Sequence, residues 1–336
     1  MTKNVLFSID FVITWVNQDD PKWRKKYSKY AGLNDDEETD IRFRDYGTLK
    51  YVFRSIDKYA PWVHKVFLIT DHQVPDWLDN NYSKLVVINH DDYIDSQYLP
   101  TFNSNVIDLN LFNINQLSEH FVYFNDDMFI NKPTRPEDFF DIKGNPRDIL
   151  GLNAIMPTGI FDHIYINNLS VVNHIFSKRK QVKKLFWKFF RFSNAEWNFF
   201  TFLLMPWPKF TRFFDPHIQL SFKKSTIKNV LEKYPEVLQQ TGMNKFRSTN
   251  DYSIWLFRYV QMLSGDFSPR SAHFGKHYAL NNWKVAVHDI ERGKHTLINI
   301  NDASFEHEYE YTNAINNVAM AFNKKFPNKS KFELTK

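Results

Sequence analysis

Cysteine is absent from all 336 residues, and glycine occurs only nine times. The first absence excludes disulfide bonds, thiolate catalysis and zinc sites built on cysteine, and it fits a reducing compartment. Long apolar runs are missing too: no window approaches the roughly 18 apolar residues of a spanning helix. The N-terminal segment lacks the apolar length and the cleavage site of a signal peptide. We therefore expect a cytoplasmic protein, peripheral at the inner face of the cell membrane if it meets a membrane at all.

Aromatic residues are abundant, with 33 Phe, 16 Tyr and 9 Trp. Together with 43% hydrophobic and 24% charged residues, they predict a folded chain of one large or two ordinary domains. The net charge of +5 is mild. It allows anionic ligands, such as nucleotide phosphates or acidic lipid, without indicating nucleic acid.

Strands and helices are expected to alternate along the first half of the chain. Residues 9–16 are β-branched and aromatic, as in a buried first strand. Further strands are expected at residues 66–70, 85–88, 121–127, 285–290 and 296–300, and helices at residues 48–59, 225–240, 252–263 and 312–326. This alternation predicts an α/β fold with a mainly parallel sheet flanked by helices, Rossmann-like or glycosyltransferase A-like.

An acidic sequence, Asn125-Asp126-Asp127, directly follows the apolar residues 121–124. In open α/β sheets, ligands bind beyond the carboxyl ends of the strands. Paired carboxylates at such a strand end suit a divalent cation held against a phosphate. Taken by itself, the sequence is equally typical of a simple turn, since Asn and Asp favour turns.

Residues 176–214 differ from the rest of the chain. Basic residues and large aromatic residues alternate there, with Glu196 as the single acid between Lys178 and Phe214. One interpretation is an element that lies on an anionic membrane surface. The other is a helical subdomain whose aromatic residues form its own core. We treat residues 1–175 and 215–326 as one catalytic unit, residues 176–214 as an insertion, and residues 327–336 as a tail that frays.

Four groups of motifs resemble the signature regions of the Stealth family of sugar-phosphate transferases. The first covers Ile9 to Asn17, followed by Gln18 where the family usually has Gly. The second runs from Arg42-Phe43-Arg44-Asp45 through Tyr59-Ala60-Pro61-Trp62-Val63, Leu99-Pro100-Thr101-Phe102-Asn103-Ser104 and Asn125-Asp126-Asp127 to Pro136-Glu137-Asp138-Phe139-Phe140. The third comprises Pro216-His217-Ile218 and Lys245 to Asp251, and the fourth is Ile300-Asn301-Asp302.

The resemblance implies an enzyme that transfers a hexose-1-phosphate from a UDP-sugar, such as a UDP-N-acetylhexosamine, to an acceptor hydroxyl. The acceptor would be a growing capsular or cell-wall polysaccharide, free or lipid-linked, and the by-product would be UMP. The sheet would bind the nucleotide sugar. The expected cofactor is Mg²⁺ or Mn²⁺.

The resemblance also implies roles for individual residues. His217 is expected to be the general base, although a lone His after Pro is otherwise usually a turn residue. Arg247 is expected to hold the transferring phosphoryl group, and Asp127 to take part in catalysis. The expected metal ligands are Asp126, Asp127, Asn301 and Asp302. The expected donor-binding residues are Trp15, Val16, Asn17, Arg42, Asp45, Arg54 and Asn103.

Two alternatives stay open at this point. The first is a metal-dependent glycosyltransferase, which would release UDP in place of UMP. The second is a glycan- or lipid-binding protein without catalytic activity.

Overall fold

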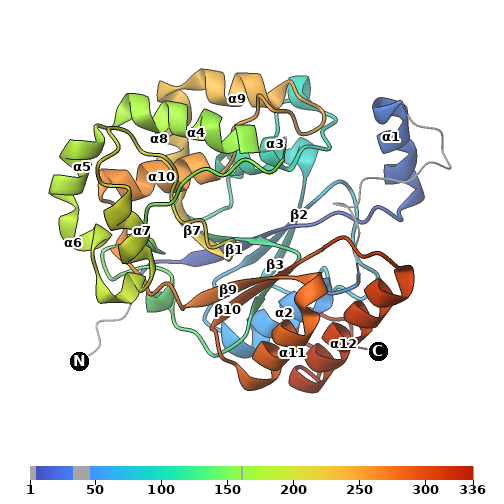
Figure 1. Cartoon of the computed structure of the whole chain (residues 1–336). Coiled ribbons are helices and arrows are strands. Elements are labelled where there is room, and N and C mark those ends of the chain that lie inside the picture. The colour runs from blue at the N-terminus through green and yellow to red at the C-terminus, as the bar shows by residue number, and fades with distance from the viewer. Residues whose placement is uncertain (1–4, 33–45, 160–161, 336) are drawn as a thin grey trace.

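A five-stranded sheet forms the centre of the molecule, which is described by a computed structural model covering residues 5–32, 46–159 and 162–335 (Figure 1). The strands lie in the order β3-β2-β1-β4-β7, and all are parallel except β7, which is antiparallel to β4. Their bounds are β1 (Ile9–Thr14), β2 (Val66–Thr70), β3 (Leu85–Asn89), β4 (His120–Asn125) and β7 (Leu220–Lys223).

The central strands are apolar on both faces because helices cover both. In β1, Phe11 and Ile13 contribute to one hydrophobic core, while Val12 between them contributes to the other. This division follows from the alternation of side chains along a strand. A nearly continuous apolar sequence is therefore what a central parallel strand requires.

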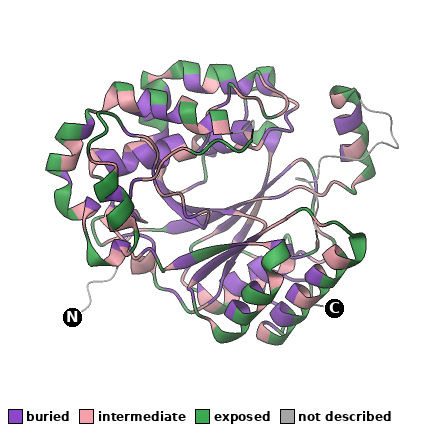
Figure 2. Cartoon of the chain, viewed as in Figure 1, coloured by how far each residue is buried: buried purple, intermediate pink, exposed green. Residues whose placement is uncertain are grey.

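Two groups of helices cover the sheet (Figure 1). One group contains α2 (Leu49–Tyr59), α11 (Trp283–Arg292) and α12 (Glu308–Lys325). The other contains α3 (Ser104–Leu109), α4 (Asp162–Ile175), α8 (Lys224–Lys233), α9 (Pro235–Gly242) and α10 (Trp255–Ser264). Figure 2 shows their buried residues facing the sheet and their exposed residues facing outward. A further helix, α1 (Pro21–Ala31), projects at the side.

A smaller sheet lies beside the first, in the order β5-β10-β9. Its strands are β5 (Met128–Ile130), β9 (Gly275–Ala279) and β10 (Leu297–Asn301). The short strands β6 (Arg147–Asp148) and β8 (Ser268–Pro269) pair separately. Only Asp126 and Asp127 separate β4 from β5, so the acidic turn joins the two sheets.

The insertion forms three short helices, α5 (Lys178–Lys184), α6 (Phe186–Phe189) and α7 (Trp197–Leu203). Part of its aromatic content is buried, including Phe189 and Phe213. Another part is exposed, with Trp187 at 79% of its surface. The aromatic residues of this segment are therefore divided between a buried core and the surface. Among the described helices, none combines the length and the apolar character needed to cross a lipid bilayer.

The predicted α/β class, with a mainly parallel sheet between helices and a helical insertion, is confirmed. The predicted strand at residues 285–290 is wrong, because these residues lie within α11. Although Val285 favours a strand by its type, Ala286 and Ile290 are four residues apart and share the buried face of the helix. The helix expected at residues 225–240 is divided into α8 and α9 by Pro235.

The tail does not fray as predicted. Phe332 is 1% exposed and packs against Phe53, with their ring centroids 5.1 Å apart. Glu333 forms an ion pair with Arg54 of α2, at 2.7 Å between Oε2 and Nη2. Residues 327–335 are therefore part of the packed structure.

Candidate functional site

A cavity of about 470 Å³ opens at the carboxyl ends of β1 and β4, and Thr14 and Asn125 lie in its wall. Strand β1 pairs with β2 on one side and with β4 on the other. The cavity therefore lies where the strand order reverses. Ligands in open α/β folds bind at this position, because the connections on either side leave a crevice there.

The acidic turn between β4 and β5 lines this cavity through Asp126 and Asp127. Strand β10 holds the turn, since the Ile300 amide donates to the Asp127 carbonyl at 3.0 Å. Burial raises the pKa of the Asp127 carboxyl to about 7. A side-chain hydrogen bond with Asn299 lowers this pKa, but its effect is smaller than that of burial. Oδ1 of Asp127 is buried without a hydrogen-bond partner in the described part of the chain, and so is Oδ1 of Asn301. Two unsatisfied oxygen acceptors in one cavity are suited to a cation or a donor group of a ligand.

His217 lies in the wall of the same cavity, directly after Pro216. Its φ of 43° is in the left-handed region, which a residue with a Cβ adopts only at a cost and which is common at functional sites. The next residue, Ile218, is fully buried against Gly275, where an added Cβ would come within 2.6 Å of Ile218 Cδ1. The absence of a side chain at position 275 thus lets β9 approach the segment that carries His217.

Burial lowers the pKa of His217 to about 4, and the nearby positive charge of Arg247 acts in the same direction. His277 also lowers it, with the two imidazole centroids 5.3 Å apart, while Asn301 raises it. The ring of Trp255 lies nearly parallel to that of His217, at 6.4 Å. At neutral pH the imidazole is therefore uncharged and able to accept a proton.

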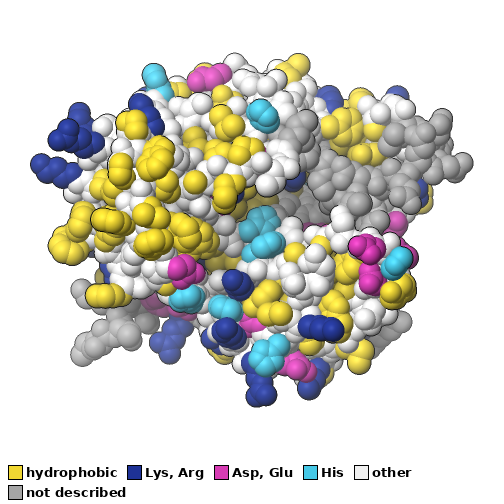
Figure 3. Space-filling view, in the orientation of Figure 1, with side chains coloured by type: hydrophobic (Ala, Val, Ile, Leu, Met, Phe, Trp, Pro, Cys, Tyr) yellow, Lys and Arg dark blue, Asp and Glu magenta, His cyan; other side chains and the backbone are white. Residues whose placement is uncertain are grey.

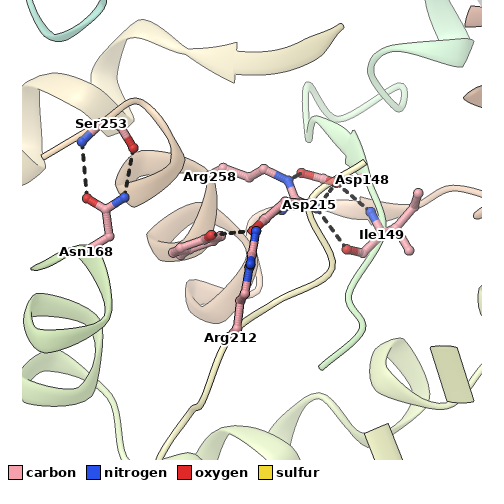
Figure 4. A network of polar contacts seen from close by, with 8 residues as sticks. Asp148, Ile149, Asn168, Arg212, Asp215, Ser253 and Arg258 are labelled. Atoms are coloured by element: carbon pink, nitrogen blue, oxygen red, sulfur yellow. Dashed lines mark hydrogen bonds and ion pairs between the residues drawn. The ribbon is translucent and has the colours of Figure 1, made fainter. Parts of the chain in front are cut away.

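A buried ion-pair network fixes the chain just before His217 (Figure 4). Arg258 of α10 is fully buried and binds Asp148 through two hydrogen bonds of 2.8 Å. Its Nη1 binds Asp215 Oδ1 at 2.9 Å, and Tyr259 donates to Asp215 Oδ2 at 2.9 Å. Asp215 is two residues from His217, so the network fixes the position from which the imidazole enters the cavity.

Arg247 lines the cavity next to the start of α3, where its Nη2 donates to Ser104 Oγ at 2.6 Å. The structure places Asn103 outside the cavity wall, contrary to its predicted contact with the donor. Its Oδ1 caps α3, and its Nδ2 donates to Asp251 Oδ2 at 2.8 Å and to the Phe246 carbonyl at 3.3 Å. Asn103 therefore joins α3 to the segment that carries Arg247.

The other predicted donor residues divide into three groups. Trp15 and Val16 line the cavity. Asn17 does not, because its backbone forms two hydrogen bonds of 2.8 Å with the Gln73 side chain in a turn. Arg54 lies away from the cavity in its ion pair with Glu333. Arg42 and Asp45 are outside the described residues.

Tyr46 and Asp108 are among the cavity residues that the sequence analysis did not predict. The Tyr46 hydroxyl donates to the Ile300 carbonyl at 2.9 Å, and burial beside Asp127 and Asp126 raises the pKa of its phenol well above 10. Burial raises the pKa of Asp108 to about 7. Tyr46 directly follows the Arg42–Asp45 motif, and this position could have identified it as a candidate site residue. No sequence pattern identified Asp108, since it lies among the buried residues of the short helix α3.

The predicted metal ligands Asp126, Asp127, Asn301 and Asp302 all line the cavity. No group of three or more Asp, Glu or His side chains suited to a metal ion is assembled within the described ranges. This does not conflict with magnesium chemistry, because Mg²⁺ usually takes one or two carboxylates and completes its shell with water and substrate phosphates. The buried Oδ1 atoms of Asp127 and Asn301 are hard oxygen donors, so the residues present fit such an ion.

Comparison with known proteins identifies relatives along nearly the whole chain. The family models described as Stealth protein CR1, conserved region 1, and Stealth protein CR2, conserved region 2, match residues 7–35 and 42–148. The exopolysaccharide phosphotransferase cps2G of Lactiplantibacillus plantarum is 45% identical, over 97% of this chain and 96% of its own. The capsular polysaccharide phosphotransferase WcwK of Streptococcus pneumoniae is 40% identical, over 97% and 98%.

Two further comparisons are more distant. The receptor polysaccharide phosphotransferase WefC of Streptococcus oralis is 36% identical, over 97% of this chain and 99% of its own. Among solved structures, the galactosyltransferase LgtC in complex with donor and acceptor sugar analogues aligns with 94% of this chain and 95% of its own. The TM-score of 0.39 and the 8% identity are too low to support any conclusion about activity.

Proposed function

The chain belongs to the Stealth family, whose members compared above are polysaccharide phosphotransferases, and on this basis we propose a specific reaction for it. The enzyme transfers a hexose-1-phosphate, in particular an N-acetylhexosamine-1-phosphate, from a UDP-sugar to a hydroxyl of a growing capsular or cell-wall polysaccharide. The observation that carries the proposal is the assembly of His217, Arg247 and the Asp126–Asp127 turn around one cavity.

In this reaction the acceptor oxygen attacks the phosphorus that bears the sugar. A bond forms between that oxygen and the phosphorus, and the bond from the phosphorus to the bridging oxygen of the diphosphate breaks. The bridging oxygen leaves with UMP, and the product is a phosphodiester. Attack at phosphorus requires an in-line nucleophile, a base for its proton and neutralisation of the phosphoryl oxygens.

His217 is the proposed base. It is uncharged at neutral pH because burial lowers its pKa to about 4, so its imidazole accepts the proton of the acceptor hydroxyl. A bound diphosphate brings negative charge near the imidazole, which raises the pKa toward the working pH. Base strength would therefore increase when the donor binds.

Arg247 is the proposed contact for the phosphoryl oxygens, because a guanidinium donates two parallel hydrogen bonds to such a group. Asp126, Asp127, Asn301 and Asp302 would hold Mg²⁺ or Mn²⁺. A bound ion supplies neutralisation of phosphoryl charge. Tyr46, whose hydroxyl stays protonated, donates a hydrogen bond that helps to fix β10 beside the turn. Trp15 and Val16 would border the uridine.

Identifying the released nucleotide tests this proposal directly. Purified protein is incubated with a panel of UDP-sugars, Mg²⁺ and an oligosaccharide acceptor. UMP together with a phosphodiester product is expected. Release of UDP would instead identify a glycosyltransferase, and no turnover with any donor would favour a binding protein.

Substitution of His217 tests the site assignment. His217→Gln should lower turnover by about 10²–10⁴-fold, the usual contribution of a general base. His288→Gln is the matched control, since His288 is exposed on α11. Full turnover by the His217 variant would remove this residue from the mechanism.

We propose also that the insertion docks on an anionic membrane, where a lipid-linked acceptor would lie. Figure 3 shows hydrophobic side chains gathered over α6 and α7. Exposed aromatic residues include Trp187 at 79%, Phe199 at 62% and Phe202 at 66%. Exposed basic residues nearby are Arg179, Lys180, Lys183 and Arg191. Apolar rings combined with a cationic surface favour anionic lipid.

Only part of the basic sequence is available for this contact. Lys178 is 3% exposed and donates to the Trp207 carbonyl at 2.8 Å, and Lys188 donates to the Phe267 carbonyl at 2.6 Å. Flotation with phosphatidylcholine vesicles, with and without phosphatidylglycerol, tests the docking. Binding should require phosphatidylglycerol and should fall in a Trp187→Ser, Phe199→Ser variant. Equal flotation with both vesicles would contradict it.

A further inference from the structure

Arg270 is buried without the hydrogen-bond partners that a buried guanidinium normally has. It is 6% exposed, and its Nε, Nη1 and Nη2 atoms are buried with no hydrogen-bond partner among the described residues. Its backbone amide donates to the Asp148 carbonyl at 2.7 Å, and its Cζ lies 4.8 Å from the centroid of the Phe274 ring, a cation–π contact. Burial lowers the pKa of Arg270 to about 10, so the side chain still carries its charge at neutral pH.

The acids near Arg270 are occupied by other groups. Both carboxylate oxygens of Asp148 bind Arg258. Asp138 Oδ2 accepts from the Arg135 amide at 2.8 Å, and Glu137 Oε1 accepts from a backbone amide at 3.2 Å. A buried cation without hydrogen bonds is costly, which suggests that a partner arrives from outside the fold.

Arg270 lines a cavity of about 830 Å³, separate from the catalytic one. Arg147 and Arg135 also line it, against the acids Glu137 and Asp138, so cationic groups are in excess. Phe274 lines the cavity with its ring against Arg270, and the remaining wall includes Pro136 and Pro269. Apolar surfaces of this kind suit the face of a sugar ring. The volume exceeds what a free phosphate ion needs and can hold a sugar with its phosphate.

We propose that this cavity binds a sugar-linked phosphate, with Arg270 as the main contact to its oxygens. This inference rests on the proposed function. If each transfer adds a phosphodiester, the growing polysaccharide carries a series of them. The cavity at Arg270 would then bind a phosphodiester formed in an earlier transfer while the catalytic cavity forms the next. The site would thus favour acceptors that already carry a phosphodiester.

Thermal unfolding with defined probes tests the site. The probes are inorganic phosphate, the methyl diester of N-acetylglucosamine 1-phosphate, and uncharged methyl N-acetylglucosaminide. All variants carry Arg247→Gln, to weaken anion binding in the catalytic cavity. The diester should raise Tm by several degrees at saturation, inorganic phosphate by less, and the uncharged sugar not at all. Phosphate stabilises most proteins to some degree. The readout is therefore the difference in the rise of Tm between the protein with Arg270 and the Arg270→Met variant.

Arg270→Met should raise Tm without any probe, because it removes an unpaired buried charge while preserving the packing of the stem. It should also abolish the specific rise with the diester. Arg292→Gln, an exposed arginine of α11, is the control and should retain that rise. Arg270→Lys keeps the charge but lacks the planar fork, so it should bind the diester at least tenfold more weakly.

Three results would overturn the inference. The first is an equal rise with the diester in the Arg270→Met variant. The second is no specific rise in either protein. The third is a large loss of Tm in Arg270→Met without a probe, which would make Arg270 structural. Failure of the proposed reaction would show itself differently, as an absence of UMP release by the unmodified enzyme.

Discussion

Arg258 and Arg270 lie twelve positions apart in the chain, and both are buried, yet their surroundings are opposite. Arg258 binds Asp148, Asp215 and the Ile149 carbonyl. The Arg270 guanidinium has no hydrogen-bond partner within the described structure, packs against the Phe274 ring and faces a cavity. Asp148 lies between them, with its carboxylate used by Arg258 and its carbonyl by the backbone of Arg270.

The difference separates two uses of a buried charge. A charge with all its partners inside the fold fixes the backbone, and Arg258 fixes the segment before His217. A charge without hydrogen-bond partners lowers stability until a ligand supplies them, as we propose for Arg270. Burial and residue type alone do not distinguish the two cases. The hydrogen-bond partners do.

Removal of the paired arginine should have the largest effect on stability. Arg258→Met leaves the buried Asp148 carboxylate without its ion-pair partner, whereas Asp215 keeps its pair with Arg212, and breaking such a buried pair costs about 3–5 kcal/mol. Chemical denaturation of this variant beside Arg270→Met measures the contrast. Equal stabilities of the two variants would break the comparison.

A buried acid extends the comparison to a charge of opposite sign. Asp108 is 5% exposed, and its Oδ1 has no hydrogen-bond partner in the described chain. Burial raises the pKa of Asp108 from 3.8 to about 7, so the folded state holds the proton over a range in which the unfolded state has lost it. Stability is therefore lost as pH rises from about 4 to 7, and the cost is complete above 7. The shift corresponds to about 4 kcal/mol at most.

Asp108→Asn should accordingly stabilise the protein at pH 8, and the gain should shrink as pH falls toward 4. Urea unfolding at several pH values measures it. A gain that does not depend on pH would show that ionisation of Asp108 is not its cause. Asp95→Asn would be the control, because Asp95 caps a short exposed turn.

The smallest of these effects concerns one hydrogen bond of the Arg258 network. Tyr259→Phe removes one of two donors to Asp215 Oδ2, the other being Arg212 Nε, and leaves both ion pairs of Arg258 intact. About 1 kcal/mol should be lost, the usual net value of one such bond. If Asp215 positions His217, turnover should fall together with stability. Tyr82→Phe is the control and should leave turnover unchanged. A change in stability without any change in turnover would limit the network to a structural role.

Local patterns in the sequence were enough to predict the four parallel strands of the central sheet. The apolar segments at residues 66–70 and 121–125 are strands because only buried strands require such continuous hydrophobicity. The pattern failed at residues 285–290, where the spacing of Ala286 and Ile290 outweighed the strand preference of Val285. It also missed β7 and β9, whose sequences contain Lys, Ser and His.

The candidate site was predicted mainly through the family resemblance. His217, Arg247, Asp127 and Asp302 are more than a hundred residues apart at their extremes, and no local pattern shows that they line one cavity. Asn103 and Arg54 show the limit of this approach. Each lies within a recognisable motif, but the motif does not distinguish a residue that contacts a ligand from one that holds the fold around it. Contacts with Asp251 and Glu333 decide that question.

The pairing of Arg54 with Glu333 has a consequence for the synthesis of the protein. The two residues are 279 positions apart, and Phe332 beside Glu333 covers Phe53. At about 5–20 residues per second, a ribosome needs roughly 14–56 seconds to make the intervening chain. During that time the outer face of α2 has no cover, and its apolar surface is open to unwanted association. A nascent chain of this protein is therefore expected to expose this surface until Phe332 and Glu333 have emerged.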